Sequence, residues 1–303
     1  MQPKRIKKNI DGIFLLDKPI GYSSNQALQK VKWLFKAAKA GHTGTLDPLA
    51  TGLLPICFGE ATKFAQYVTD ADKTYIASVK FGATTTTGDA EGEVLTQAPV
   101  TFDLATLKKT CAKFLGEITQ IPPMHSALKF EGKALYEYAR AGVEVERKAR
   151  QITIYIITVE SFVEAVATIT VTCSKGTYIR TLAEDIGIAL GCGAHLIGLR
   201  RTETAGFKIC DAITLEQLIE KSEQNASLET LLQPVDAAIL NFPAIQLEKN
   251  AAFRITQGQV VKMSDKNIQT MVGEVRAYDE ESRFLGLCQC EQGKIMPKRL
   301  IKF

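Results

Sequence analysis

A run of alternating residue types, "AVATITVTCSKG" (Ala165–Gly176), places the strongest constraint on how this chain folds. Small and apolar residues occupy every second position, and threonines fill most of the positions between them. Because successive side chains of a strand point to opposite faces of a sheet, the run predicts a strand with one buried face. The residues predicted to share that face are Ala165, Ala167, Ile169, Val171 and Cys173.

A helix is predicted directly after this strand. The segment "YIRTLAEDIGIALG" repeats apolar residues at the spacing of one helix face. The predicted stripe consists of Ile179, Leu182, Ala183, Ile186, Ala189 and Leu190. Near the N-terminus, Ser23 and Gln26 fit a capping box at the start of another apolar-periodic helix. That helix would bury Ala27, Leu28, Val31, Leu34 and Phe35.

Two further segments complete the prediction of fold class. "KTYIASVKFG" predicts a strand ended by Gly82, and "FDLATLKKTCAKFLG" predicts a helix ended by Gly116. Strands and helices alternate without a strict βαβ rhythm, which favours an α+β fold with a mixed, largely antiparallel sheet.

The chain is expected to contain two domains. Helical pieces precede Pro243, so a boundary near 241–243 separates a first domain, residues 1–240, from residues 243–303. The second segment shows short strands and turns, typical of a small β-barrel. It holds ten Lys or Arg against seven Asp or Glu, whereas the rest of the chain is almost balanced. This charge favours an anionic partner such as RNA, with a merely solvated charged surface as the alternative.

Composition excludes several classes of protein. Hydrophobic residues make up 46% and charged residues 23%, and no apolar run is long enough to span a bilayer. The basic N-terminal segment is followed by too short an apolar stretch for a signal peptide, so we expect a cytoplasmic protein. The seven cysteines are scattered without a C-x-x-C pair, which argues against a zinc site or a disulfide framework. We therefore expect neither metal nor organic cofactor.

One aspartate stands in an unusual setting. In "AGHTGTLDPLATGLLPICFGEATKF", Asp47 is surrounded by small residues and is followed by Pro48, which restricts the aspartate to extended conformations. A turn aspartate that accepts backbone N–H groups is one interpretation. His42 alone is too little for a metal site, and Lys63 lies too far along for a phosphate-binding loop. The functional interpretation is a lone carboxylate that acts as nucleophile or base.

This run resembles the catalytic motif of the bacterial TruB family of tRNA pseudouridine synthases. Five other segments resemble motifs of the family in the same order, so the resemblance covers nearly the whole chain. These segments are "LLDKPIGYSSN", "KTYIASVKFGATTTTGDAEG", "IPPMHSALKFEGKALYEYARAG", "CSKGTYIRTLAEDIG" and "GAHLIGLRRTETAGF". The ending "FLGLCQCEQGKIMPKRLIKF" resembles the family's C-terminal PUA-type RNA-binding domain.

The resemblance implies roles for individual residues. Asp47 matches the catalytic aspartate, and Tyr75 matches the tyrosine that stacks on the flipped uracil. Tyr178 matches a second active-site tyrosine, and Arg180 matches the arginine that pairs with the catalytic carboxylate. Leu199 matches an apolar residue against the base.

Three other positions are marked by the same resemblance. His42 matches a histidine that intercalates into the opened T-loop, and Lys63 matches a motif lysine near the site. The segment from about 120 to 150 matches an RNA-contacting insertion. His125 stands where the family frequently has tyrosine, so it receives no role.

The implied activity is conversion of uridine to pseudouridine at position 55 in the T-loop of tRNA, by a monomer that contacts the T-arm stem-loop. The aspartate could attack C1′, add to C6, or promote loss of the C2′ proton, and the sequence leaves these routes open. The alternatives are a non-catalytic tRNA-binding or folding chaperone and a guide-RNA-dependent pseudouridine synthase.

Overall fold

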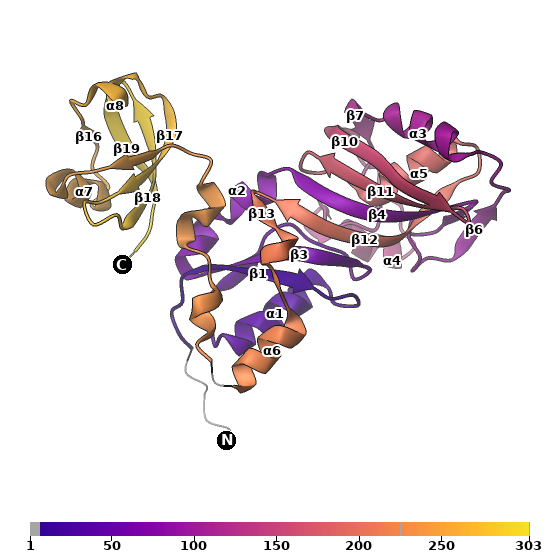
Figure 1. Ribbon diagram of the computed structural model, residues 1–303, viewed down its shortest axis with the longest axis horizontal. Coiled ribbons are helices and arrows are strands. Elements are labelled where there is room, and N and C mark those ends of the chain that lie inside the picture. Colours follow the sequence, from indigo (N-terminus) through magenta and orange to yellow (C-terminus); the bar gives the residue numbers. More distant parts are fainter. Residues whose placement is uncertain (1–6, 225, 303) are drawn as a thin grey trace.

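The computed structural model describes residues 7–224 and 226–302. Figure 1 shows a large mixed sheet with helices packed on it and a separate small lobe at the C-terminal end. The large sheet has ten strands, and its main path runs β14-β1-β3-β12-β4-β11-β10-β7, with β13 paired to β12 and β2 to β3. Only the β1–β14 and β3–β12 pairs of this sheet are parallel. The predicted α+β class with a mixed, largely antiparallel sheet is confirmed.

The strands of the large sheet are distributed along residues 12–214. Their bounds are β1 Gly12–Lys18, β2 Ala40–His42, β3 Ala50–Phe58, β4 Lys73–Phe81, β7 Gly116–Gln120, β10 Arg150–Val163, β11 Val166–Cys173, β12 Ala194–Thr204, β13 Phe207–Lys208 and β14 Ile213–Thr214. Two short hairpins stand apart from it: β5 Ala83–Thr85 with β6 Val94–Gln97, and β8 Lys129–Phe130 with β9 Lys133–Ala134.

Helices cover this sheet and join its strands. The α-helices are α1 Ser24–Leu34, α2 Ala65–Asp70, α3 Leu104–Ala112, α4 Leu135–Arg140, α5 Ile179–Ala189 and α6 Leu215–Glu223. The 3₁₀ segments are η1 Gly59–Phe64, η2 Ile209–Asp211, η3 Leu228–Leu231 and η4 Val235–Ile239. Among the described residues, no helix has the length and apolar character needed to cross a membrane.

The strand that most constrains the fold forms from Val166 to Cys173, but Ala165, predicted to share its buried face, lies in the preceding turn at φ +62°. Ala167, Ile169, Val171 and Cys173 are buried on one face of β11, where they pack into the main core with α5. Ser23 caps α1 with a complete capping box through Gln26. β4 ends at Phe81, directly before Gly82 at φ +91°.

Two helix predictions need correction. The helix predicted to reach Gly116 ends at Ala112, and Gly116 instead begins β7. On α5 the apolar stripe is buried as far as Ile186, and Leu190 still packs against the core, whereas Ala189 is exposed.

The C-terminal lobe is a five-stranded sheet of order β15-β17-β18-β19-β16. Its strands are β15 Ala244–Gln246, β16 Val261–Lys262, β17 Gly273–Tyr278, β18 Phe284–Glu291 and β19 Lys294–Leu300. Two helices, α7 Lys249–Thr256 and α8 Lys266–Thr270, accompany it. Cys288 and Cys290 face the same side of β18 and are both fully buried in this lobe's own core. The exact domain boundary stays a prediction.

Candidate active site

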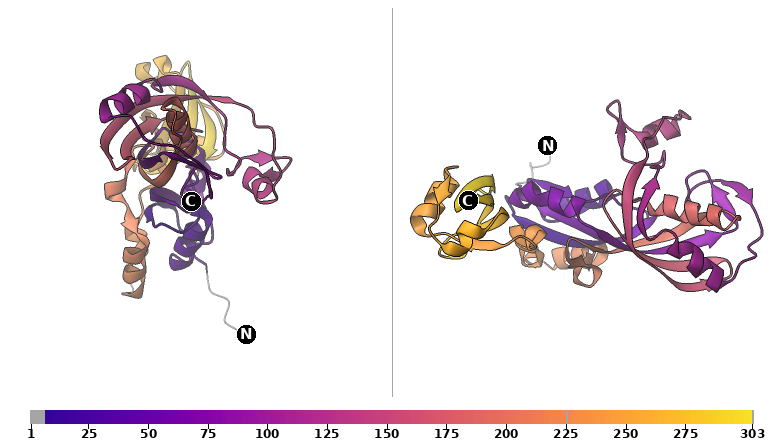
Figure 2. Two further views of the ribbon diagram at one scale, coloured as in Figure 1. Left: turned by 90° about the vertical axis from the view of Figure 1, so that its right-hand side faces the viewer. Right: turned by 90° about the horizontal axis from the view of Figure 1, so that it is seen from above.

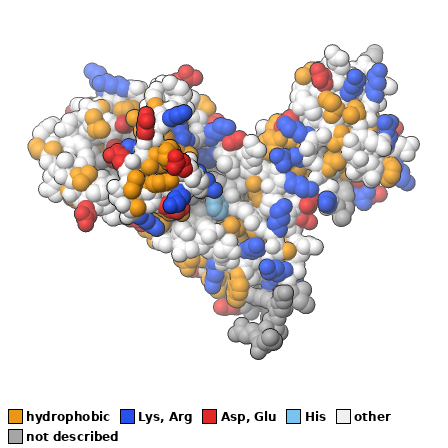
Figure 3. All heavy atoms as spheres, turned by 180° about the vertical axis from the view of Figure 1, so that it is seen from behind, with side chains coloured by type: hydrophobic (Ala, Val, Ile, Leu, Met, Phe, Trp, Pro, Cys, Tyr) orange, Lys and Arg blue, Asp and Glu red, His pale blue; other side chains and the backbone are white. Residues whose placement is uncertain are grey.

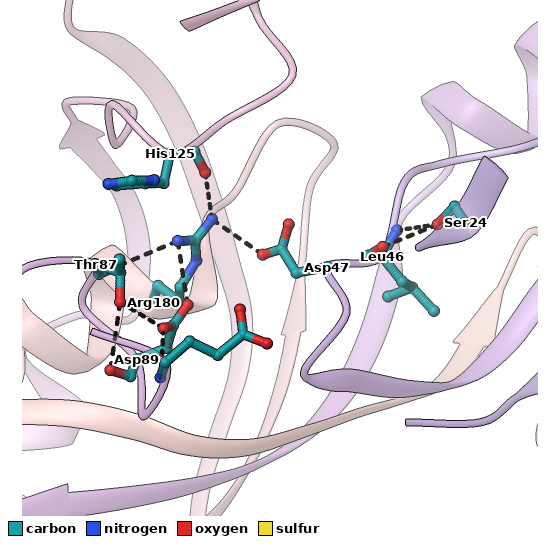
Figure 4. Close-up of polar contacts among 8 residues, drawn as sticks. Ser24, Leu46, Asp47, Thr87, Asp89, His125 and Arg180 are labelled. Carbon is teal, nitrogen blue, oxygen red and sulfur yellow. Dashed lines mark hydrogen bonds and ion pairs between the residues drawn. The ribbon is translucent and has the colours of Figure 1, made fainter. Parts of the chain in front are cut away.

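The loop that carries Asp47 joins β2 to β3 and is held from several sides. The buried hydroxyl of Ser24, at the start of α1, donates to the Leu46 carbonyl at 2.9 Å and accepts the Leu46 N–H at 2.7 Å (Figure 4). Gly21 donates its N–H to the carbonyl of Pro48 at 2.9 Å. These bonds fix the backbone on both sides of the aspartate, so its direction is set before any substrate arrives.

The other side of the loop rests on a buried arginine. Arg201 on β12 is 1% exposed, and it donates to the carbonyls of Leu53 and Gly44 at 2.7 and 3.1 Å. Gly44 has φ +68°, and a Cβ there would lie 3.1 Å from the Arg201 guanidinium. The left-handed backbone therefore favours glycine here, and a Cβ would also crowd the arginine.

Arg180 joins the Asp47 loop to two other segments. It lies in the first turn of α5 and is 6% exposed. Its Nη2 is 3.0 Å from Asp47 Oδ2 and donates to the His125 carbonyl at 2.5 Å. Its Nη1 is 3.3 Å from Asp89 Oδ2 and donates to the Thr87 carbonyl at 3.1 Å. Figure 4 shows this one guanidinium between the two carboxylates.

The electrostatics of Asp47 reflect two opposing effects. Partial burial raises the pKa of the Asp47 carboxyl above its usual value, while the Arg180 guanidinium opposes that rise. The side chain still keeps 43% of its exposure, so the carboxylate remains accessible to a ligand. The arrangement provides a partly desolvated carboxylate held by a fixed cation, which suits a nucleophile or a base.

A cavity of about 350 Å³ opens beside this carboxylate. Its lining includes five residues that the sequence analysis assigned to the site: Asp47, Tyr75, Tyr178, Arg180 and Leu199. A larger cavity of about 1010 Å³ lies elsewhere, between η4 and the ends of β4 and β12. It contains none of these residues, so the smaller cavity is the candidate active site. Its volume lies within the range of small-molecule sites.

Strands β4 and β12 and the start of α5 position the aromatic and apolar side chains that wall this cavity. Tyr75 lies on the central strand β4 and is 7% exposed, and burial raises the pKa of its phenol. Tyr178 precedes α5 and is fixed by Gln120, which accepts the Tyr178 N–H at 2.8 Å and donates to its carbonyl at 3.1 Å. Leu199 on β12 pairs with Ala77 and Ala50.

Two assigned residues do not line the cavity. His42 ends β2, and its buried Nδ1 has no hydrogen-bond partner among the described residues. Burial lowers the pKa of its imidazole, so it is neutral near pH 7. Lys63, predicted to lie near the site, lies instead at the base of the C-terminal lobe, where it contacts Glu60 and the Leu300 carbonyl.

Several site residues were not singled out from the sequence. Asp89, Arg201 and Lys73 lie in quoted motifs, but their roles depend on contacts between distant segments. Lys73 lines the cavity, and burial lowers its pKa to about 8. Lys18 is fully buried, donates to the carbonyls of Pro19 and Tyr22, and has a pKa lowered to about 8 by burial. Within the part of the chain that the structure describes, no three His, Cys, Asp or Glu side chains are placed to hold a metal ion.

Comparison with known proteins matches this geometry to a family. The model of the TruB family pseudouridylate synthase N-terminal domain matches residues 32–179. Models of the tRNA pseudouridylate synthase B C-terminal domain and of the pseudouridine synthase II TruB C-terminal region match residues 180–240 and 243–301. The chain belongs to the TruB family.

Whole-chain relatives support the same assignment. The chain is 57% identical over 303 residues to tRNA pseudouridine synthase B of Methylobacillus flagellatus, covering 100% of this chain and 99% of that one. It is 50% identical to the same enzyme of Pseudomonas aeruginosa, with 99% of each chain covered. Among solved structures, the crystal structure of a Cbf5-Nop10-Gar1 complex matches with a TM-score of 0.72 and 25% identity, over 96% of this chain and 84% of that chain.

Proposed function

We propose that this chain converts uridine to pseudouridine in tRNA, at position 55 of the T-loop, with Asp47 as the catalytic carboxylate. The observation that carries the proposal is the Asp47–Arg180 pair, 3.0 Å apart, at the wall of a cavity that also holds Tyr75 and Leu199. The reaction breaks the N1–C1′ bond, turns the uracil and joins C1′ to C5, while C5 loses its proton and N1 takes one up. No atom is added from outside, so a preorganised carboxylate and a stacking wall are the groups that it needs.

The cavity suits a base that has left its stack. Flipping a base out of an RNA helix or loop costs a few kcal/mol, which contacts in the pocket must offset. Stacking on an aromatic ring contributes about 1–3 kcal/mol per base, and Tyr75 provides a ring held rigidly by two neighbouring strands. Leu199, on the adjacent strand β12, closes the cavity with an apolar surface. The backbone of the RNA would then lie outside the cavity.

The surface around the site supports a polyanionic substrate. Figure 3 shows Lys and Arg side chains gathered between the large lobe and the C-terminal lobe. In Figure 2 the insertion from about 120 to 150, with α4, projects away from the sheet. Three of its residues, Ser126, Ala127 and Leu128, line the cavity. We infer that the T-arm lies across this face, between the insertion and the C-terminal lobe, and that the protein acts as a monomer.

The test uses an unmodified tRNA transcript with the protein alone, followed by mapping of pseudouridine at single-nucleotide resolution. We expect product at position 55 without any guide RNA. The Asp47→Asn variant is near-isosteric and lacks the charge, so it should lose at least about 10⁴-fold in single-turnover rate, as when a catalytic nucleophile is removed. Its affinity for tRNA should be nearly unchanged.

Other outcomes would reject the proposal in separate ways. Binding without product by the wild-type protein would indicate a tRNA-binding chaperone. Product only when a guide RNA is added would indicate the guide-dependent class. Product from Asp47→Asn at more than a trace rate would make Asp47 a structural turn residue. A dimer in sedimentation of the protein–tRNA complex would contradict the monomer.

A further inference from the structure

Lys63 and Glu60 tie the catalytic domain to the end of the chain. Lys63 Nζ lies 2.6 Å from Glu60 Oε2 and donates to the Leu300 carbonyl at 2.7 Å. The same Glu60 oxygen accepts the backbone N–H of Lys302 at 2.7 Å. We call this group, Glu60, Lys63, Leu300 and Lys302, the interdomain clasp. The side chains of Glu60 and Lys63 are largely covered, at 19% and 27% exposure, so this pair is less screened than a surface pair.

The clasp borders an apolar seam between the two lobes. Phe64, the residue after Lys63, contacts Phe284 of β18 with ring centroids 5.6 Å apart. Leu287 of the C-terminal lobe is fully buried in the same cluster as Phe64 and Ile239. Apolar contacts resist separation but set orientation only loosely, whereas hydrogen bonds fix direction. The clasp is therefore placed to fix the angle of a lobe that the seam already holds, together with the hydrogen bonds that the Tyr67 hydroxyl donates to Glu274 at 3.0 Å and the Tyr278 hydroxyl donates to Asp236.

The position of the clasp separates it from the catalytic cavity. The clasp begins just after Gly59, which follows the last residue of β3, and Asp47 precedes the first residue of the same strand. The nine residues of β3 span roughly 30 Å at about 3.3 Å per residue. Lys63 cannot reach a base held beside Asp47.

We propose that Lys63 is a positioning residue, which acts through Glu60 and the end of β19 to hold the C-terminal lobe at the angle that tRNA requires. This inference rests on the proposed function for its RNA readout. The competing role is a direct contact between the Lys63 ammonium and an RNA phosphate. The two roles predict opposite effects for removal of Glu60, because that residue is an anion.

The first experiment compares Lys63→Met with Glu60→Ala in tRNA binding across a salt series. If the clasp positions the lobe, both variants weaken binding, each by about tenfold, the size expected for removal of a charge-assisted bond. The salt dependence of binding stays at its wild-type slope, and single-turnover rates at saturating protein stay within about twofold. The double variant is no weaker than either single variant, since both remove one unit. Lys63→Arg retains most of the affinity.

A phosphate contact gives a different pattern and would overturn the proposal. Lys63→Met would then reduce the steepness of the slope of log binding constant against log salt concentration by about one. Glu60→Ala would leave binding unchanged or strengthen it, because a negative charge near the RNA is removed. The effects of Lys63→Met and Glu60→Ala on binding would have opposite signs, and they would be additive in the double variant.

The second experiment needs no RNA and so tests the clasp even if the proposed function fails. Cys210 is exposed, and the other six cysteines are buried, so one spin label can be placed on the native protein at Cys210. A second label enters at the exposed α7 position through Asn250→Cys. We expect the distance distribution between the labels to shift or broaden in Lys63→Met and Glu60→Ala relative to the clasp-intact protein. An unchanged distribution in both variants would refute a positioning role.

Discussion

Asp47 carries a carboxylate whose surroundings act on its pKa in opposite directions. Burial raises the pKa, and Arg180 opposes the rise. Asp89 shares the same guanidinium and, as a second anion, adds to the rise. The carboxylate must be ionised to act as nucleophile or base. The raised pKa makes ionisation less favourable but makes the ionised carboxylate more reactive. These opposing effects predict that the acid side of the pH–rate profile depends on Arg180.

We expect the single-turnover rate to fall on the acid side with a midpoint above the ordinary aspartate pKa, because the folded protein raises the pKa of Asp47. Activity is present above that midpoint and disappears as pH falls through it. Arg180→Gln removes the opposing cation, so its midpoint should move to higher pH. Arg180→Lys keeps the charge but loses the forked geometry to Asp47, Asp89 and two carbonyls. Its rate should fall at every pH with a nearly unchanged midpoint.

The measurement is the rate of pseudouridine formation at saturating protein, at about pH 3.5 to 8, a range that starts below the ordinary aspartate pKa of about 3.9, with folding checked at each pH. An Arg180→Gln midpoint equal to that of the wild type would show that another group controls the acid side. A lower midpoint would contradict the assigned sign of the arginine's effect.

At the scale of elements, the Asp47 loop depends on a contact from a helix that is distant in sequence. Ser24 is 1% exposed and satisfies both backbone groups of Leu46 through one hydroxyl. Ser24→Ala would leave those two groups without a partner, which costs about 1–3 kcal/mol. We expect the melting temperature to fall by several degrees and the rate to fall roughly ten- to a hundredfold through misplacement of Asp47.

The neighbouring residue provides a matched control. Asn25 is on the same helix turn, is exposed, and accepts only from Gln29 at 3.3 Å among its side-chain hydrogen bonds in the described part of the chain. Asn25→Ala should change neither stability nor rate appreciably. Equal effects of the two substitutions would locate the cause in α1 itself rather than in the loop.

The same contact shows what the sequence could predict. The strand at Val166–Cys173, the capping box at Ser23, and the α+β class follow from local patterns, and each is present in the structure. Five of the seven assigned site residues line one cavity. The bond from Ser24 to Leu46 and the pair of Arg180 with Asp89 join segments far apart in sequence, so periodicity and spacing carry no signal for them.

Where prediction failed, a local signal was outweighed or absent. The sequence predicts Gly116 as a helix terminus, but its φ of +88° serves the entry into β7, and the helix ends earlier at Ala112. The motif around Lys63 indicated a residue near the site. Its ammonium is instead used at the seam, because β3 carries the chain away from Asp47 before the lysine is reached.

At the scale of the whole molecule, the C-terminal lobe shares part of its core with the catalytic domain. Leu287, Phe284 and Ile301 pack with Phe64 and Ile239 in one apolar cluster. Deleting residues from about 243 would expose this cluster to water, so a truncated protein would lose stability as well as RNA contacts. Charge substitutions on the surface of the lobe therefore test its role in binding more cleanly than deletion.

Two exposed lysines of this lobe lie directly opposite each other. Lys262 on β16 is the register partner of Lys294 on β19. Like charges at such a position are destabilising by a few tenths to about 1 kcal/mol, and a phosphate bound between them would relieve the repulsion. Lys262→Gln combined with Lys294→Gln should therefore weaken tRNA binding while leaving the melting temperature equal or higher. The slope of log affinity against log salt concentration should become shallower by about one, because the one phosphate that is no longer neutralised lowers it by about 0.9.

The control for this prediction is the pair Lys108→Gln and Lys109→Gln, two exposed lysines on α3, which lies at the end of the sheet far from the C-terminal lobe (Figure 1). It removes the same net charge, so it separates a local contact from the general field of the protein. Binding and salt slope should change little in the control, and single-turnover rates at saturating protein should change little in either variant, since Asp47, Tyr75 and Arg180 remain. Equal losses of affinity in the two pairs would show that only net charge matters. An unchanged dissociation constant and an unchanged salt slope in the Lys262 and Lys294 variant would show that the basic surface of the lobe is only solvated. The catalytic domain alone would then bind the RNA.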